Sequence, residues 1–365
     1  MSEPLVDVVI ACHDVSRPIE RAVGSVLQDA AAQASVRVTV VAHGLPAAPF
    51  EQRLAALDGQ WRVASFTDGV RSAAGPFNHG IDLATADYVM VMGSDDFLEP
   101  GAMTAWLEHV RAERPSAAII PIRIDGFPVM PNPLTRLGRV KNLDATKDRM
   151  FYRTAPLALV ARDEIARLKL RMVERVRVGE DFEFGIRLWG RGRRLDYLAG
   201  TPCYVIGTDA RERTTEAPMH IEEALEPLTR LMDESIPAEL SPAHRRSLAI
   251  KLVRVSVIGN VQARGAAATW RGDDEVAALG AILRRLVGLA PRVLTPFNRP
   301  DRRLLDGLLS EPTVARVTAD AQRANSAGRL ERWLTPNPLH SFDRESTLRR
   351  YVLYFLKRDR SGQTP

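Results

Sequence analysis

The first third of the chain alternates apolar runs with stretches of helical periodicity, and this alternation restricts the fold more than any other feature. Runs rich in β-branched residues predict strands at 6–11, 36–42, 61–66, 88–92 and 117–124. Helical spacing between them predicts helices within 18–33, 50–57, 72–85 and 104–113. We therefore expect an α/β domain whose mostly parallel sheet has helices on both faces.

The character of the sequence changes near residue 218. Before it, a Pro-, Gly- and Arg-rich loop is expected at 121–147, then a helix at 163–168 and a pair of strands at 194–198 and 203–206. After it, helical signals dominate, at 221–232, 242–263, 275–289, 303–309 and 347–357. We expect a domain over 1–217 and a mainly helical domain over 218–365 that binds an acceptor, mediates self-association or contacts a membrane surface.

Composition narrows the class of protein. The 365 residues are 45% hydrophobic and 26% charged, which is typical of a globular protein. A net charge of +5 suits an anionic ligand or membrane surface, while 6% aromatic residues without a stacking pattern argue against nucleic acid. Two cysteines, Cys12 and Cys203, favour a reducing compartment. The N-terminus resembles a first strand more than a signal peptide, and no apolar stretch is long enough to span a bilayer, so we expect a cytoplasmic protein, with peripheral contact at the inner face of the membrane as an alternative.

Polar and small side chains follow each of the first four predicted strands. The carboxyl ends of parallel strands meet at one edge of a sheet, where α/β proteins bind ligands. The candidate binding residues at this edge are Ala11, His13, Asp14, His43, Asp68, Ser94, Asp95 and Asp96.

Two adjacent carboxylates, Asp95 and Asp96, end the fourth strand. Paired carboxylates hold a hard cation such as Mg²⁺ or Mn²⁺, which then bridges to phosphate oxygens of a nucleotide. The alternative is structural, because Asp favours turns and caps the helix expected after Pro100.

A second acidic pair, Glu180 and Asp181, opens a predicted helix. Such residues serve as a general base facing a cleft, or simply favour the helix dipole. Among the surrounding arginines, Arg211 and Arg213 follow a predicted strand end and are candidates for gripping phosphate. The chain has no P-loop, no G-x-G-x-x-G at a strand–helix junction and no H-E-x-x-H motif.

Three segments in this order carry a resemblance: VDVVIACHD, FNHGIDLATADYVMVMGSDDFLEPGAM and GEDFEFGIRLWGRG. Over roughly residues 6–215 the chain resembles family 2 glycosyltransferases of the GT-A fold. The second segment is the most specific, because it keeps the family's order and spacing at Asn78, Gly80, Ala84, Tyr88, Asp95, Asp96 and Pro100.

The resemblance implies an inverting, metal-dependent sugar transfer from a nucleotide-diphosphate donor. By match, Asp95 binds Mn²⁺ or Mg²⁺, Asp96 supports the metal or the sugar, and Asn78 belongs to the donor side. Asp181 is the implied catalytic base, with Glu180 beside it, and Asp14 is implied to lie near the nucleobase and ribose. The implied partners are a UDP-sugar donor and a hydroxyl of a cell-wall, capsule or lipid-linked glycan.

The chain departs from the family pattern at several positions. Gly93 stands where an acidic residue is usual, and Ala42 and His43 replace aspartates of which one recognises uracil. Phe77 replaces a common arginine, and His13 stands where an aromatic ring often stacks on the base. A donor other than a UDP-sugar, or a different way of holding uracil, therefore stays open.

Two other functions remain as alternatives. The missing acidic residues allow a non-catalytic nucleotide-sugar or glycan-binding module. A nucleotidyltransferase has a similar sheet but normally a glycine-rich loop after the first strand, and CHDVSRPIE has no glycine. The terminal segment TLRRYVLYFLKRDR either packs inward or lies on an anionic membrane surface, and a homo-oligomer is possible.

Overall fold

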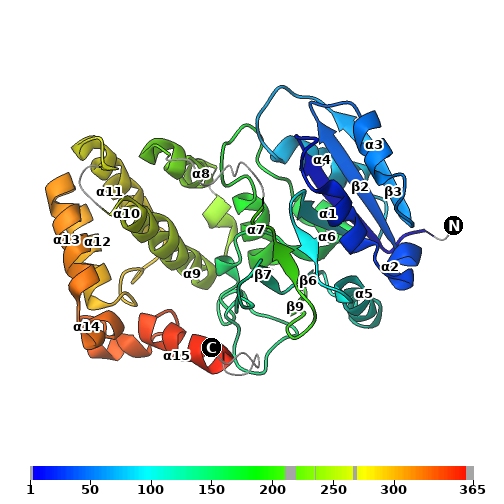
Figure 1. Cartoon of the computed structure of the whole chain (residues 1–365). Coiled ribbons are helices and arrows are strands. Elements are labelled where there is room, and N and C mark those ends of the chain that lie inside the picture. Colours follow the sequence, from blue (N-terminus) through cyan, green and yellow to red (C-terminus); the bar gives the residue numbers. More distant parts are fainter. Residues whose placement is uncertain (1–2, 210–218, 235, 266–268, 359–365) are drawn as a thin grey trace. The chain divides into compact units, whose positions relative to one another are not determined.

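The computed structural model describes residues 3–209, 219–234, 236–265 and 269–358. The chain divides into two compact units, which we describe separately (Figure 1). The described part of the N-terminal unit comprises residues 3–144 and 153–209, and that of the C-terminal unit comprises 145–152 and the residues from 219 onward. Arg211 and Arg213, predicted to grip phosphate, lie outside the described residues.

A seven-stranded sheet organises the N-terminal unit, in the order β3-β2-β1-β4-β8-β6-β9. Its central strands are almost completely buried, as expected for parallel strands covered on both faces. Only β8 runs antiparallel to its neighbours β4 and β6, so the predicted, mostly parallel α/β sheet is confirmed. The strands are β1 (Val6–Cys12), β2 (Val36–His43), β3 (Gln60–Phe66), β4 (Tyr88–Gly93), β6 (Ala117–Ile119), β8 (Ala158–Ala161) and β9 (Leu195–Tyr197).

Helices cover both faces of this sheet. Val6, Val8 and Ile10 point into a core shared with α1, α2, α3 and α5, whereas Val9 points to the opposite face and meets α4. There Gly80 permits a close approach, because an added Cβ would lie 2.1 Å from a methyl group of Val9. The helices are α1 (Ile19–Val26), α2 (Ala30–Ser35), α3 (Ala48–Leu54), α4 (Ala74–Leu83), α5 (Ala102–Glu113), α6 (Arg162–Leu168) and α7 (Phe182–Arg191).

A smaller sheet of β5 (Phe97–Leu98), β10 (Tyr204–Ile206) and β7 (Ile122–Ile124) corrects two expectations. The single strand predicted at 117–124 is split at Ile120 and Pro121, and its halves, β6 and β7, join different sheets. The segments predicted as a strand pair, now β9 and β10, also lie in different sheets. Local apolar patterns predicted the strands, whereas their partners depend on contacts distant in sequence.

The helix predicted within 18–33 is also interrupted. α1 ends at Val26, and α2 begins at Ala30 with Asp29 as its N-cap, whose Oδ1 accepts a hydrogen bond from the amide of Ala32 (2.9 Å). Because Asp29 caps the start of α2 in an extended conformation, α1 cannot continue through this position.

The C-terminal unit is helical, as predicted, and within the described ranges no helix is long and apolar enough to cross a membrane. Its α-helices are α8 (Ile221–Asp233), α9 (Pro242–Leu252), α10 (Gly259–Arg264), α11 (Asp273–Gly288), α12 (Arg299–Ser310), α13 (Val314–Ser326), α14 (Arg329–Trp333) and α15 (Thr347–Arg358). A π-helical stretch, η3 (Val253–Ile258), joins α9 to α10, and the 3₁₀ turns are η1 (Met150–Tyr152), η2 (Ile236–Glu239) and η5 (Pro338–Phe342).

Candidate functional site

Asp96 is held by the smaller sheet at the carboxyl end of β4. The hydroxyl of Tyr204, on β10, donates to Asp96 Oδ2 and accepts from the amide of Gly93 (3.0 Å). The amide of Gly207 donates to Asp96 Oδ1 (2.9 Å). Burial nevertheless raises the pKa of Asp96 to about 6, because desolvation outweighs these two hydrogen bonds. Both carboxylate oxygens are thus engaged by the protein.

Two glycines make this arrangement possible. A Cβ at Gly93 would lie 2.4 Å from Asp96 Oδ2, so the Asp96 carboxylate occupies the space that a side chain at position 93 would need. This gives a physical reason for the departure at Gly93, where the family usually has an acidic residue. A Cβ at Gly207 would lie 2.0 Å from the carbonyl oxygen of Asp95, so only glycine lets β10 approach this loop.

Two arginines contact Asp95, Arg17 from the loop before α1 and Arg21 from α1 itself. Arg17 Nη1 lies 2.8 Å from Asp95 Oδ2, and Arg21 Nη2 donates to the carbonyl of Asp95. Arg21 also grips Asp209 with both amino groups, at 2.6 and 2.9 Å. The sequence analysis missed these residues. The two arginines that follow the first strand were an available signal, since residues just after a parallel strand lie at the edge where the acidic residues gather.

The residues that follow β1, β2 and β3 also lie at this carboxyl edge. Both carboxylate oxygens of Asp14 accept from Ser16, at 2.8 Å from its amide and 2.7 Å from its hydroxyl. His43 Nε2 lies 2.8 Å from Asp68 Oδ1. Burial and the neighbouring Arg17 lower the pKa of His13. His43 acts in the same direction, and the negative charges of Asp14 and Asp95 oppose the shift without reversing it.

Ala11 and Ser94 complete this edge without offering charged groups. Ala11 pairs with Val41 of β2 and Gly93 of β4, and Ser94 is buried beside Cys12. The eight residues predicted from the strand ends therefore share one edge of the sheet.

Asn78 lies on α4, and its side chain is engaged with another part of the chain. Its Oδ1 accepts from the amide of Met172 (2.9 Å), and its Nδ2 donates to the carbonyl of Met172 (2.9 Å) and to Glu174 (3.0 Å). The amide of Val173 in turn donates to the carbonyl of Glu180 (2.7 Å). Asn78 thereby holds the segment that leads into the second acidic pair.

The direction of α7 turns its N-terminus, where Asp181 lies, toward the carboxyl end of β4. Beyond the helix's C-terminus, the amide of Arg194 donates to Ser116 (2.6 Å), just before β6, at the amino ends of the parallel strands. Nearer the N-terminus of α7, Gly185 packs against the carbonyl of Thr154, which precedes β8. Because β8 is antiparallel to β4, the beginning of β8 lies toward the carboxyl end of β4. α7 therefore runs opposite to β4.

Asp181 lies one turn before Gly185, whose amide donates to the Asp181 carbonyl (2.9 Å). It is the N-cap residue of α7, and the positive φ of 74° at Gly179 precedes it. Neighbouring Glu180 has a raised pKa because burial disfavours its charged form.

The acidic residues at the end of β4 fit a divalent ion that is shared with a nucleotide. Mg²⁺ is commonly bound by one or two carboxylates together with substrate phosphates, so a complete cage of protein ligands is not required. The ion pair of the Asp95 carboxylate with Arg17 involves Oδ2, whereas both oxygens of Asp96 accept hydrogen bonds, from Tyr204 and Gly207. Asp95 is therefore the side chain best suited to hold the ion, with Asp96 fixing the loop.

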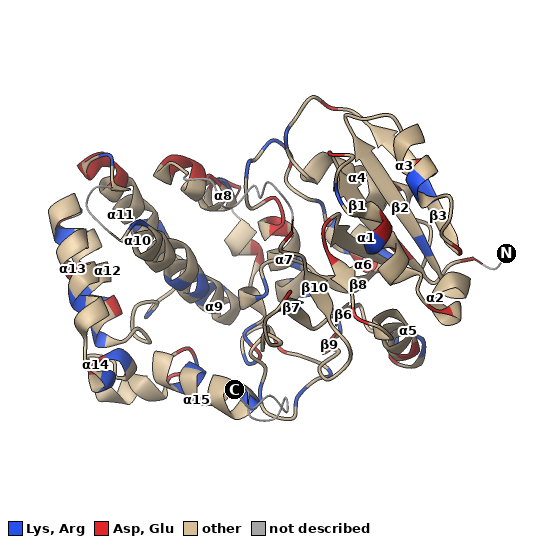
Figure 2. Ribbon diagram, in the orientation of Figure 1, with Lys and Arg blue, Asp and Glu red and all other residues tan. Residues whose placement is uncertain are grey.

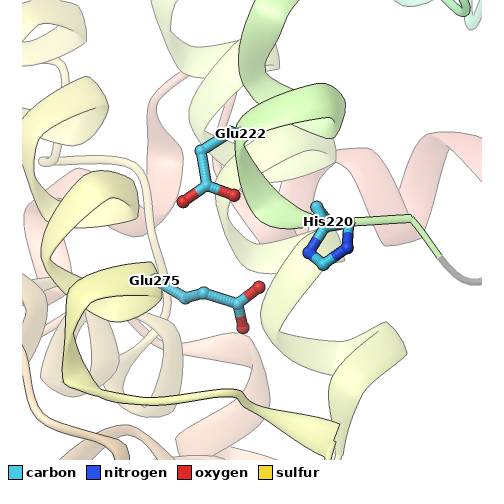
Figure 3. Close-up of side chains that lie close together, drawn as sticks. All are labelled: His220, Glu222 and Glu275. Atoms are coloured by element: carbon cyan, nitrogen blue, oxygen red, sulfur yellow. The ribbon is translucent and has the colours of Figure 1, made fainter.

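One cluster of three potential metal ligands occurs among the described residues, and it lies in the C-terminal unit (Figure 3). Donor atoms of His220, Glu222 and Glu275 all lie within 4.8 Å of one another. The buried Glu275 carboxylate accepts from the amides of Ile221 (3.5 Å), at the start of α8, and Arg271 (3.1 Å). These contacts are those of a helix-capping carboxylate.

A pocket of about 550 Å³ lies at the other end of the strands. Its lining includes Tyr88 at the start of β4, Arg114 after α5 and Arg162 at the start of α6. The residues predicted from the strand ends do not line this pocket. A search for the site by cavity volume alone would therefore have selected the amino ends of the strands instead of the carboxyl edge.

Comparisons with known proteins identify the kind of domain and its fold. Residues 7–165 match the family described as Glycosyl transferase family 2. The structure of S. aureus TarS 1–349 in complex with UDP-GlcNAc superposes with a TM-score of 0.70 at 13% identity, covering 88% of this chain and 91% of that one. The complex of TarS 1–349 with UDP gives 0.70 at 14% identity and the same coverage. No curated protein matches the chain in sequence.

At these identities the likeness to TarS establishes the fold, and the family match establishes the kind of domain. The acidic end of β4, the parallel sheet and the segment matched by the family coincide in the N-terminal unit. This chain therefore contains a family 2 glycosyltransferase domain of GT-A-like fold, which includes residues 7–165.

Proposed function

We propose that this glycosyltransferase is inverting and metal-dependent, and that it transfers a sugar from a nucleotide-diphosphate donor to a hydroxyl of a cell-wall, capsule or lipid-linked glycan. The proposal is supported by the positions of Asp95, at the carboxyl end of β4, and Asp181, at the N-terminus of α7, which runs opposite to β4. A leaving-group site and a separate base are the two parts that a direct displacement needs.

The reaction follows from the roles of these side chains. Asp181 accepts the proton of the acceptor hydroxyl, whose oxygen forms a bond to the anomeric carbon as the bond from that carbon to the diphosphate breaks. Attack from the face opposite the leaving group inverts the anomeric centre. Asp95 would hold Mn²⁺ or Mg²⁺, which supplies charge neutralisation for the departing diphosphate. Asp96 and Arg21 keep the Asp95 loop in position.

A UDP-sugar is our proposed donor, supported by the UDP-GlcNAc and UDP complexes of the structurally similar TarS. In this chain His13, Asp14, His43 and Asp68 would meet the nucleoside. The contact between His43 and Asp68 orients the imidazole, so one ring nitrogen is left to face a base at a position where the family uses aspartate. We place the reaction in the cytoplasm, because the two cysteines, Cys12 and Cys203, are buried free thiols.

The test compares Asp181→Asn with Asp58→Asn, a change at an exposed acidic residue after α3. Release of nucleoside diphosphate is measured with several nucleotide sugars and acceptors in the presence of Mn²⁺ or Mg²⁺, and donor binding is followed by the rise in melting temperature. We expect Asp181→Asn to lower turnover by about 10²–10⁴-fold while donor binding survives, and Asp58→Asn to change neither.

Other outcomes would point elsewhere. Turnover that survives Asp181→Asn would remove Asp181 as the base. Donor binding without turnover on a broad acceptor panel would favour a binding module, and pyrophosphate release from a nucleoside triphosphate would favour a nucleotidyltransferase. For the metal, Asp95→Asn should abolish the stabilisation by Mn²⁺ with UDP.

A further inference from the structure

The last described helix, α15, leaves large apolar side chains uncovered. Tyr351, Val352, Phe355 and Leu356 are 49%, 47%, 53% and 42% exposed. Their spacing along a helix, at i, i+1, i+4 and i+5, gathers them on one side. An ordinary terminal helix that packs inward buries such a stripe, so this stripe needs another explanation.

The uncovered area extends beyond α15. The turn η5 packs beside this helix, and Arg349 Nη1 donates to the carbonyl of Phe342 (3.1 Å). Leu339 and Phe342, both on η5, are 76% and 71% exposed. We call Leu339, Phe342, Tyr351, Val352, Phe355 and Leu356 the C-terminal apolar surface. Contiguous exposure of this kind marks an interaction site.

The charges around this surface are positive. α15 contains Arg349 and Lys357 and no acidic residue (Figure 2). Arg350 turns inward instead, because its guanidinium lies over the ring of Tyr152 and pairs with the buried Glu345 (3.8 Å). Asp343 pairs with Arg246 (2.9 Å), so both acids of the preceding turn are already engaged. The partner of the C-terminal apolar surface must therefore be apolar and bear negative charge.

We propose that the C-terminal apolar surface lies on an anionic lipid surface, with the aromatic and aliphatic side chains among the acyl chains and the cations at the phosphate headgroups. A short helix with one apolar side, aromatic residues and flanking cations is suited to this environment. A second copy of the chain fits less well, because a twofold contact would bring the basic helices together. The inference does not rest on the proposed sugar transfer.

Flotation of the full chain with vesicles tests the proposal. We expect it to float with phosphatidylcholine vesicles that contain phosphatidylglycerol, to stay behind with phosphatidylcholine alone, and to detach as salt is raised. The double variant Tyr351→Ser/Phe355→Ser should lower partitioning by about tenfold or more, because both rings leave water on binding. Phe127→Ser is the matched control, since Phe127 is 63% exposed in the N-terminal unit and should not matter.

The positive charges have their own test. Arg349→Gln/Lys357→Gln should weaken binding to the anionic vesicles by about tenfold and leave the far-ultraviolet circular dichroism spectrum unchanged. Equal flotation of wild type and Tyr351→Ser/Phe355→Ser, or no flotation at low salt, would overturn the proposal. A dimer that Phe355→Ser dissociates, without vesicle binding, would assign the surface to a second copy and would overturn it as well.

Discussion

Replacing Tyr204 by phenylalanine tests how the acidic loop after β4 is held. The side chain is only 1% exposed, and its hydroxyl joins the amide of Gly93 to the carboxylate of Asp96. Tyr204→Phe keeps the ring and its packing but leaves the Gly93 amide without its acceptor and Asp96 without one donor. Leaving such buried groups unsatisfied costs about 1–3 kcal/mol. For a domain of this size, about 2 kcal/mol lowers the melting temperature by about 4–8 °C.

The loss should depend on pH with a defined sign. Burial already raises the pKa of Asp96 to about 6, and the hydrogen bond from Tyr204 opposes that rise, so the pKa rises further in the variant. A carboxyl whose pKa is raised in the folded state does not affect stability below its unfolded pKa. Its destabilising effect grows as the pH rises from the unfolded pKa to the folded pKa and is complete above the folded pKa. Tyr204→Phe should therefore cost more at about pH 8 than at about pH 4.

The measurement is urea unfolding of the metal-free protein at these two pH values, followed by circular dichroism. Tyr197→Phe is the matched control, because Tyr197 is also buried and no hydrogen bond of its hydroxyl is seen within the described residues. It should change the free energy of unfolding by less than about 0.5 kcal/mol at both pH values. Equal losses in the two variants, or a loss for Tyr204→Phe that is the same at both pH values, would refute the role assigned to the hydroxyl.

Two further substitutions probe the same edge of the sheet. Gly207→Ala forces a Cβ against the Asp95 carbonyl, so we expect it to lower the free energy of unfolding by about 1–3 kcal/mol and to weaken the rise in melting temperature with UDP. Gly259→Ala is the control, because the space around Gly259 is open, and it should be neutral or stabilising. Retention of UDP binding by Gly207→Ala would contradict the close approach. Glu180→Gln removes a partly buried carboxyl whose pKa is raised, so the change should stabilise the fold above that pKa and not at acid pH. Glu108→Gln, at an exposed position, should have no such pH dependence. A loss of stability at alkaline pH would show that the Glu180 charge is compensated.

Much of the architecture was predictable because its signals are local. Apolar runs and helical periodicity predicted β1 to β4 and the helices between them, and their order implied that the ends of these strands share an edge. Asp95, Asp14, His43 and Asp68 were found in this way. The same local pattern could not show that Pro121 separates two strands of different sheets, since strand partners are chosen by contacts between distant segments.

The sequence by itself thus determined a parallel α/β domain with acidic residues at the end of β4, because burial and periodicity are properties of short segments. Only the tertiary structure decided what those residues touch. Tyr204 and Gly207 reach Asp96 from more than 100 positions away, Arg17 comes from the loop before α1 and Arg21 from α1, and the Asp96 carboxylate fills the space left by Gly93. These contacts arise from the packing of β10 and α1 against one loop, and no spacing within a single segment encodes that packing.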